Sequence, residues 1–234
     1  MIYINGQAVA PTISVQNGGI DDKITPDYIT DGLIALYDGI KNTRNGHNPN
    51  SLVWEDLSGN NYDLTVSNSP AMLFKEDCLI NTASETVVGT TASISSVVTM
   101  EIVLRAYRVA TSCIMQLNRN SARTLAYISG GNYVSFKDNN TSYSINSTKR
   151  NHISADYSNS IYLINGQTPT SSSNTDNWDL PSSNNIQLFK YDNKSTYPFI
   201  GEICSVKLYN RVLTAEEKTH NLAIDIGRFG IEVE

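Results

Sequence analysis

The sequence has few charged residues and no long apolar run. Only 17% of its 234 residues are charged, and the formal net charge is −6. Lys and Arg are scattered and form no basic stripe, which argues against binding to a phosphate backbone. No apolar run approaches the roughly 18 residues needed to span a membrane. We therefore expect a protein that neither binds nucleic acid nor inserts into a membrane.

Cysteine is also scarce. Cys78, Cys113 and Cys204 are the three cysteines, and an odd number without a C-x-x-C pair is not typical of a disulfide scaffold. A metal site built on closely spaced thiols is disfavoured for the same reason. Cys204 lies in a predicted strand, where a free cysteine behaves as a small apolar side chain. We therefore expect free thiols.

The N-terminus lacks the features of a secretion signal. The first residues read MIYINGQAVAP, without the basic and apolar segments of a signal peptide. Two interpretations stay open. Either the protein reaches its destination by another route, or the sequence lacks a leader that the secreted protein carries.

Catalytic motifs are missing as well. A glycosidase needs two carboxylates facing each other across a sugar-binding cleft. The adjacent acids at 76–77 would point to opposite faces of a strand, and those at 216–217 suit a helix start. The three histidines are scattered, and no G-x-S-x-G elbow accompanies them. We therefore predict that the protein is not an enzyme.

Short apolar runs separated by turn residues are abundant, which is typical of an all-β protein. In VVTMEIVLRAYRV, apolar side chains alternate with polar ones from Val98 to Ala106. Asn165-Gly166 in IYLINGQ favours a tight hairpin turn, and IYINGQAV at 2–9 repeats that chemistry. Residues 11–30 resemble a linker in composition. The predicted organisation is a hairpin arm and linker at 1–30 and a main domain at 31–234.

The stretch GEICSVKLYNRVLTAEEKTHN at 201–221 changes periodicity halfway. Its first part predicts a strand with Cys204, Val206 and Leu208 on one face. Thr214 and Glu217 then predict a capping box at the start of a helix that ends at Gly227. The apolar stripe of this helix is predicted to contain Ala215, Thr219, Leu222, Ala223 and Ile226.

This closing segment resembles that of concanavalin A-like jelly rolls of the laminin-G and pentraxin-like kind. Their pattern is roughly G-x-I-x-x-V-x-[IL]-Y-x-R-x-L-[ST]-x-x-E. Three further segments are similar to family motifs in the family's order: GLIALYDG at 32–39, VWEDLSGNNYDLTV at 53–66 and HISADYSNSIYLINGQ at 152–167. The resemblance covers roughly residues 31–230. It implies an all-β fold, a two-sheet antiparallel jelly-roll sandwich, here with a short C-terminal α-helix and an N-terminal arm.

Calcium is a cofactor that the resemblance raises, because many relatives bind it through loop oxygens. DLSGNNYD provides the candidate ligands Asp56, Asn60 and Asp63. The alternative, which we prefer, is a turn in which Asp56 and Asn60 bond their own backbone.

Sugar binding needs an aromatic ring for the apolar sugar face and planar polar groups for the hydroxyls. Two polar loops, TDNWDLPSSNN and KYDNKSTY, supply both. The candidate ligand-binding residues are Trp178, Asp179, Asn185, Tyr191, Asp192 and Tyr197. Alternatively, Trp178 anchors its loop in the core.

Fold alone does not fix function. We expect a non-catalytic, lectin-like protein of a virion, as a phage head or tail fibre or a decoration protein, that contacts glycans on the host surface. A phage protein is released by lysis without a leader, and MIYINGQAV is similar to small structural proteins of phages infecting gut bacteria. Residues 1–30 would then bind other virion proteins or further copies of the chain, for example in a trimer. The alternatives are a bacterial surface or secreted carbohydrate-binding module and, less favoured, a glycan hydrolase.

Overall fold

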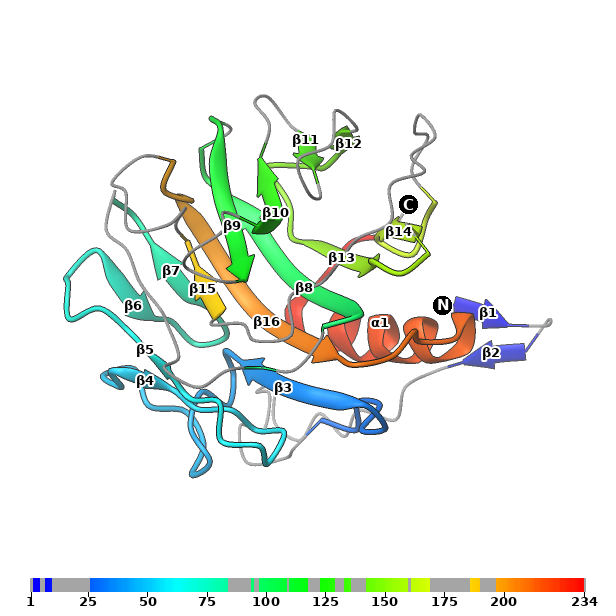
Figure 1. Ribbon diagram of the computed structural model, residues 1–234, viewed down its shortest axis with the longest axis horizontal. Helices are drawn as coiled ribbons and strands as arrows, with labels where there is room; N and C mark the ends of the chain where they lie inside the picture. The colour runs from blue at the N-terminus through cyan, green and yellow to red at the C-terminus, as the bar shows by residue number, and fades with distance from the viewer. Residues whose placement is uncertain are drawn as a thin grey trace.

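Two antiparallel β-sheets, of seven and five strands, form the body of the computed structural model, with one helix at the C-terminal end (Figure 1). The structure describes residues 2–4, 7–9, 26–83, 94, 97–108, 110–117, 123–128, 133–135, 142–159, 161–168, 186–189 and 197–233. The predicted all-β sandwich with a terminal helix is confirmed. Among the described residues, no helix has both the length and the apolar character needed to cross a membrane.

The larger sheet is built around the long strand β16. Its strands are, in order across the sheet, β14 (Ile161–Ile164), β13 (Asn151–Asp156), β8 (Thr99–Ala106), β16 (Gly201–Tyr209), β7 (Leu79–Asn81) and β6 (Met72–Phe74). The seventh strand, β3 (Leu33–Asp38), pairs with residues 205–209 of β16, while β7 pairs with residues 201–203. The two short strands therefore share one edge of β16.

The smaller sheet contains β12 (Ser142–Ser144), β11 (Tyr133–Ser135), β10 (Arg123–Ile128), β9 (Ser112–Leu117) and β15 (Ile186–Leu188), in this order. β10 and β11, neighbours in the sequence, pair antiparallel. Two further hairpins pair β1 (Ile2–Ile4) with β2 (Gln7–Val9) and β4 (Val53–Trp54) with β5 (Leu64–Thr65).

The main core lies between the two sheets. Met100, Ile102 and Leu104 of β8 are fully buried there, as their alternation predicted. Val206 and Leu208 of the neighbouring β16 join them. Each such side chain contributes about 1.5–3 kcal/mol when it leaves water, so this face of the larger sheet holds the sandwich together.

The prediction that Cys204 shares a strand face with Val206 and Leu208 is wrong because β16 carries a β-bulge. Leu104 pairs with Ile203 and Val103 pairs with Ser205, so Cys204 is an extra residue in the ladder. A bulge reverses the alternation of side chains beyond it. Ile203 therefore lies in the core between the sheets, and Cys204 lies in a second apolar cluster on the opposite face.

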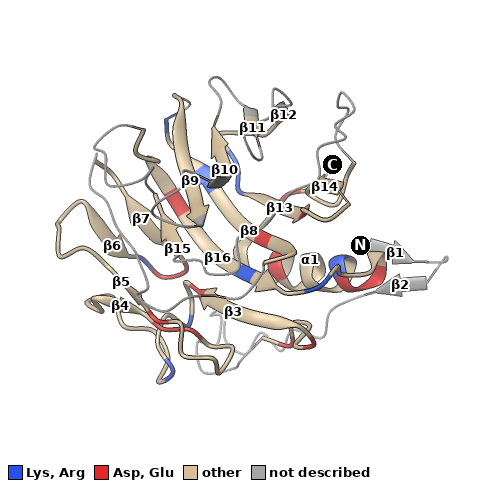
Figure 2. Ribbon diagram, viewed as in Figure 1, with Lys and Arg blue, Asp and Glu red and all other residues tan. Residues whose placement is uncertain are grey.

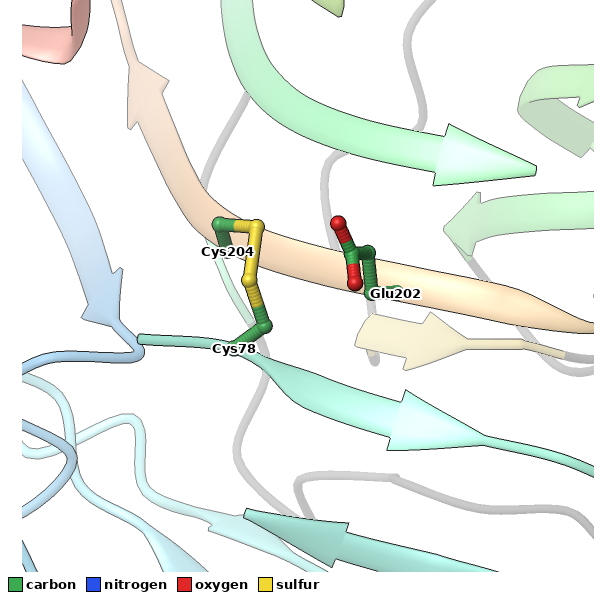
Figure 3. A group of neighbouring side chains, drawn as sticks. All are labelled: Cys78, Glu202 and Cys204. Carbon is green, nitrogen blue, oxygen red and sulfur yellow. A yellow bond between two sulfur atoms is a disulfide. The ribbon is translucent and has the colours of Figure 1, made fainter. Parts of the chain in front are cut away.

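Cys204 forms a disulfide bond with Cys78, which corrects the expectation of free thiols (Figure 3). The two residues are 126 positions apart, but the pairing of β7 with β16 brings their Cα atoms to 4.0 Å. Cys113 is buried and takes no part in this disulfide. The sulfur atoms lie within 4.8 Å of a carboxylate oxygen of Glu202, yet the bond between them uses the thiolates that a metal ion would need.

The helix α1 (Ala215–Phe229) begins as predicted. The backbone N–H of Glu217 donates to Thr214 Oγ1 at 3.2 Å, and the N–H of Thr214 donates to Glu217 Oε2 at 2.8 Å, which completes the capping box. The helix continues past Gly227 and ends at Gly230, whose φ of 63° is left-handed. Its buried residues Arg228 and Phe229 form the last turn, so the predicted end was three residues too early.

The buried face of α1 is more polar than predicted. Leu222 and Ala223 of the predicted stripe are buried, but Ala215 is exposed, and the other two members are only half-buried. The helix instead buries Lys218, Asn221, Asp225 and Arg228. The reason is that α1 covers the outer face of the larger sheet, which is itself polar at this place (Figure 2).

Residues 26–30 pack onto α1, although the composition suggested a linker. The Tyr28 side chain is only 3% exposed, and its hydroxyl donates to Asp225 Oδ1 at 2.5 Å. The N–H of Ile29 donates to Asn221 Oδ1 at 3.1 Å. Residues 26–30 therefore pack against the main domain, and the division of the chain at Asp31 stays a prediction.

Candidate functional site

A polar groove of about 430 Å³ lies where β12, the start of β13, the end of β14 and the C-terminal tail meet. This volume is within the roughly 300–1,000 Å³ range of small-molecule sites. The groove is lined by Ser144, Ile145, Asn146, Lys149, Asn151, Ile164, Asn165, Gln167 and Glu232.

One wall is the turn between β12 and β13. The buried Asn151 side chain fixes it by donating to the carbonyl oxygens of Asn146 at 2.7 Å and Lys149 at 3.0 Å. Asn151 Oδ1 in turn accepts from the N–H of Asn146 at 3.0 Å. Both N–H groups and the oxygen of this amide thus bond within the turn, which holds Asn146 and Lys149 at the groove.

The opposite wall is the Asn165-Gly166 turn, which forms as predicted. Both residues have positive φ, 52° and 78°, as a type I′ turn requires. Asn165 Oδ1 accepts from the N–H of His152 at 2.8 Å, which fixes the side chain. Within the described part of the chain, Asn165 Nδ2 and the side-chain amide of Gln167 make no hydrogen bond, so both side chains are available to a ligand.

The third wall is the tail that follows α1. Ile231 is buried in the second apolar cluster with Phe229 and the disulfide, and it anchors the tail. The next residue, Glu232, accepts a hydrogen bond from Lys149 Nζ. The groove therefore combines amide and hydroxyl groups, which can donate to and accept from sugar hydroxyls, with one cation and one anion.

A buried charged cluster lies beneath α1, next to the Asn165-Gly166 turn. Lys207 Nζ of β16 donates to Asp225 Oδ2 of α1 at 2.6 Å, and both side chains are fully buried. His152 Nε2 of β13 lies 3.4 Å from the same oxygen. A cavity of about 30 Å³ separates this histidine from Gly166 and Leu222. Figure 2 shows the charged positions on β8, β16 and α1.

Burial shifts the pKa of His152 and that of Glu101 on β8, whose carboxylate accepts from Asn221 Nδ2 of α1 at 2.7 Å. It raises the pKa of Glu101 to about 7, an effect that the nearby Lys207 ammonium partly opposes. It also lowers the pKa of His152 to about 4, although the Asp225 carboxylate opposes this. By linkage, the contribution of Glu101 to stability is lost as the pH rises from 4.5 to 7, and that of His152 is lost as the pH falls from 6.5 to 4. The cluster is closed to a polysaccharide, and its role is to fix α1 and hence the tail.

Of the ligand-binding residues predicted from the sequence, the structure describes Tyr197 alone, and Tyr197 does not line the groove. Trp178, Asp179, Asn185, Tyr191 and Asp192 lie outside the described residues. Tyr197 is described, is 51% exposed and has a φ of 65°. Its carbonyl accepts from the N–H of Cys113 on β9 at 2.9 Å, whereas the groove adjoins β12, at the other end of the smaller sheet.

The predicted calcium ligands lie together, as the DLSGNNYD motif indicated. Asp56 is fully buried, and its carboxylate accepts from the N–H groups of Leu36 at 3.0 Å, Ser58 at 2.9 Å and Tyr62 at 3.0 Å.

The other two candidates are also engaged. Asp63 accepts from the N–H of Asp56 at 2.8 Å and pairs with Arg44. Asn60 Nδ2 donates to the carbonyl of Ile34 at 3.2 Å. These bonds match the turn interpretation, in which protein donors occupy the carboxylates, and calcium binding here stays a prediction.

Sequence reasoning missed the groove as a site, although it identified one of its parts. The Asn165-Gly166 motif predicted the turn but not the ligands beside it. Lys149 and Glu232 are 83 positions apart, and no local pattern joins them. The signal that was present is the density of Asn, Ser and Gln around 144–151 and 165–167.

The comparisons with known proteins identify the family. The profile of a laminin G-type family, described as the concanavalin A-like lectin/glucanases superfamily, matches residues 85–217, which is more than half of the chain. No curated protein matches the sequence.

Solved structures share the fold at low identity. The Trypanosoma rangeli sialidase in complex with sialic acid is 15% identical, with a TM-score of 0.56 over 84% of this chain and 33% of that chain. The binding domain of Paraclostridial Mosquitocidal Protein 1 is also 15% identical, with a TM-score of 0.54 over 82% of this chain and 52% of that chain. This chain thus spans about a third of the first protein and half of the second. These structures share the fold alone, and the match of the family profile shows that the chain belongs to the concanavalin A-like lectin/glucanase superfamily.

Proposed function

We propose that this protein is a non-catalytic, lectin-like module that binds a glycan in the groove. The observation that carries this proposal is the set of amide side chains at one concave site, of which those of Asn165 and Gln167 have unused hydrogen-bonding groups. Amides of this kind recognise the hydroxyl groups of sugars. The lectin-like fold supports glycan binding in general.

The absence of catalysis is part of the proposal. A glycosidase needs two carboxylates at the bond that it cleaves, and Glu232 is the one carboxylate among the groove-lining residues that the structure describes. Glu101 and Asp225, the carboxylates on the other side of the Asn165-Gly166 turn, are fully buried beneath α1. We therefore expect the purified protein to release no reducing ends from the glycans that it binds.

Filling the groove should abolish glycan binding. Gln167 is exposed and its side chain makes no hydrogen bond to the described residues, so Gln167→Trp blocks the groove without removing a structural contact. We expect at least a tenfold loss of affinity for any glycan selected on an array, with an unchanged melting temperature. Affinity is measured by titration calorimetry.

The matched control is Asn68→Trp. Asn68 is also exposed and lies between β5 and β6, and β6 is at the opposite end of the larger sheet from β14. This variant should bind as the wild type does. If Gln167→Trp also binds normally, the groove is not the glycan site, and the loops around Trp178 become the candidate.

We further propose that the protein belongs to a virion, with residues 1–25 as its attachment segment. The β1–β2 hairpin pairs with none of the other described strands, and hairpins of this kind can extend the sheet of a partner. The partner would be another virion protein or a further copy of the chain, as in a trimer. The alternative is a bacterial surface or secreted carbohydrate-binding module.

Deleting residues 1–25 should separate attachment from folding. Because Pro26–Thr30 remain docked on α1, the shortened chain should melt as the full chain does but remain monomeric and fail to incorporate into particles. Deleting residues 1–30 also removes Tyr28 and should lower the melting temperature. Light scattering and particle incorporation measure the outcome. Normal assembly of the 26–234 chain would contradict the proposed role of the arm.

A further inference from the structure

We infer that the groove selects an acidic saccharide, whose single carboxylate displaces the Glu232 carboxylate from Lys149. This inference rests on the glycan binding proposed above and names the class of ligand. The inference is based on the ion pair between Lys149 and Glu232 inside the groove, which joins the turn before β13 to the C-terminal tail. Glu232 then acts as a competitor that the protein itself provides.

Lys149 is placed to read one negative charge. Among the described residues that line the groove it is the one cation, and its backbone carbonyl is fixed by the buried Asn151. The side-chain amides of Asn165 and Gln167 line the same groove. A sugar can therefore present its carboxylate to the ammonium and its hydroxyl groups to the amides at the same time, which a neutral sugar cannot do.

The ion pair is easily exchanged. The Lys149 and Glu232 side chains are 39% and 65% exposed, and exposed pairs of this kind are weak because water screens them. Glu232 also follows Ile231, the last buried residue in the described part of the chain. A carboxylate that arrives with several hydroxyl contacts can replace it at little cost.

The single lysine among the described groove residues limits the bound sugar unit to one carboxylate. A sulfated or otherwise polyanionic glycan would meet a single cation in the groove and a chain with a net charge of −6. Repulsion from that charge disfavours a polyanion. The groove therefore fits a uronic acid or another monocarboxylated sugar rather than a heparin-like chain.

The test uses pairs of glycans that differ in the carboxylate. The full chain is titrated with methyl glucuronide and methyl glucoside, methyl galacturonide and methyl galactoside, and sialyllactose and lactose, with heparin as the polyanion. The variants are Lys149→Gln and Glu232→Gln. The matched controls are Lys75→Gln and Glu76→Gln, which make the same changes at exposed side chains beyond β6.

We expect the wild type to prefer the acidic member of at least one pair by tenfold or more. Lys149→Gln should lower the affinity for the acidic member until the two members of the pair bind equally. Glu232→Gln should raise the affinity for the acidic member about two- to fivefold, the range that an exposed ion pair allows. The two control variants should bind as the wild type does.

The outcomes separate this inference from the proposal on which it rests. Equal binding of the acidic and the neutral member of every pair, abolished by Gln167→Trp, would keep the glycan site and overturn the acidic selectivity. Preference for heparin, or no gain with Glu232→Gln, would also overturn it. If the protein binds no glycan on an array, both the proposed glycan site and the acidic selectivity are wrong.

Discussion

Reduction of the Cys78–Cys204 disulfide should lower the free energy of unfolding by about 2–5 kcal/mol. The bond closes a loop whose ends are 126 positions apart, and a cross-link over a long loop restricts the unfolded chain more than one over a short loop. In the folded protein the bond lies in the second apolar cluster beside Phe229 and Ile231. Its loss therefore also loosens the packing that anchors the tail at the groove.

Urea unfolding of the oxidised and the reduced protein measures this effect. The variant Cys113→Ala should keep the full difference in the free energy of unfolding between the oxidised and the reduced protein, because Cys113 is outside the bond. The double variant Cys78→Ala/Cys204→Ala should be insensitive to the reductant. Alkylation of the unfolded, oxidised protein should modify Cys113 alone. If all three cysteines react, the bond does not form.

The features that the sequence predicts well are those that depend on neighbouring residues. The capping box needs only Thr214 and Glu217, and the tight turn needs only Asn165 and Gly166. The alternation of β8 is also local, since its ladder continues without a bulge from Met100 to Leu104 against β13. In each case the signal and the structure occupy the same few positions.

The features that were missed depend on pairing between distant segments. The extra residue in β16 is visible only against β8, because the bulge is a mismatch between two strands. The same mismatch turns Cys204 toward Cys78, so the wrong strand face and the missed disulfide have one cause. The groove was missed for a related reason, since its walls come from 144–151, 164–167 and 232.

The face of α1 was mispredicted because an apolar stripe is usually the buried one. Here the covered surface is the outer face of a sheet, where Glu101, His152 and Lys207 already point outward from the apolar core. A polar face on the sheet selects a polar face on the helix, because buried charges need partners. The pairing of Lys207 with Asp225 is the clearest example.

Removing the charge of Asp225 should destabilise the protein by about 3–5 kcal/mol. Asp225→Asn keeps the size of the side chain but leaves the fully buried Lys207 ammonium without its partner at 2.6 Å. It also weakens the acceptor of the Tyr28 hydroxyl, which holds residues 26–30 on the helix. The desolvation cost of a buried charge exceeds what a neutral amide can return. The free energy of unfolding is measured by urea titration.

A double variant distinguishes the loss of the partner from a general disturbance of α1. Lys207→Met removes the buried charge, so Asp225→Asn/Lys207→Met should be more stable than Asp225→Asn alone, with a coupling energy of at least about 1 kcal/mol. The matched control is Asp31→Asn. Asp31 pairs with Arg211 at 2.8 Å but is 85% exposed, and its loss should cost no more than about 1 kcal/mol. Equal effects of Asp225→Asn and Asp31→Asn, or strict additivity in the double variant, would mean that Lys207 and Asp225 do not depend on each other, and that other contacts hold α1 on the sheet.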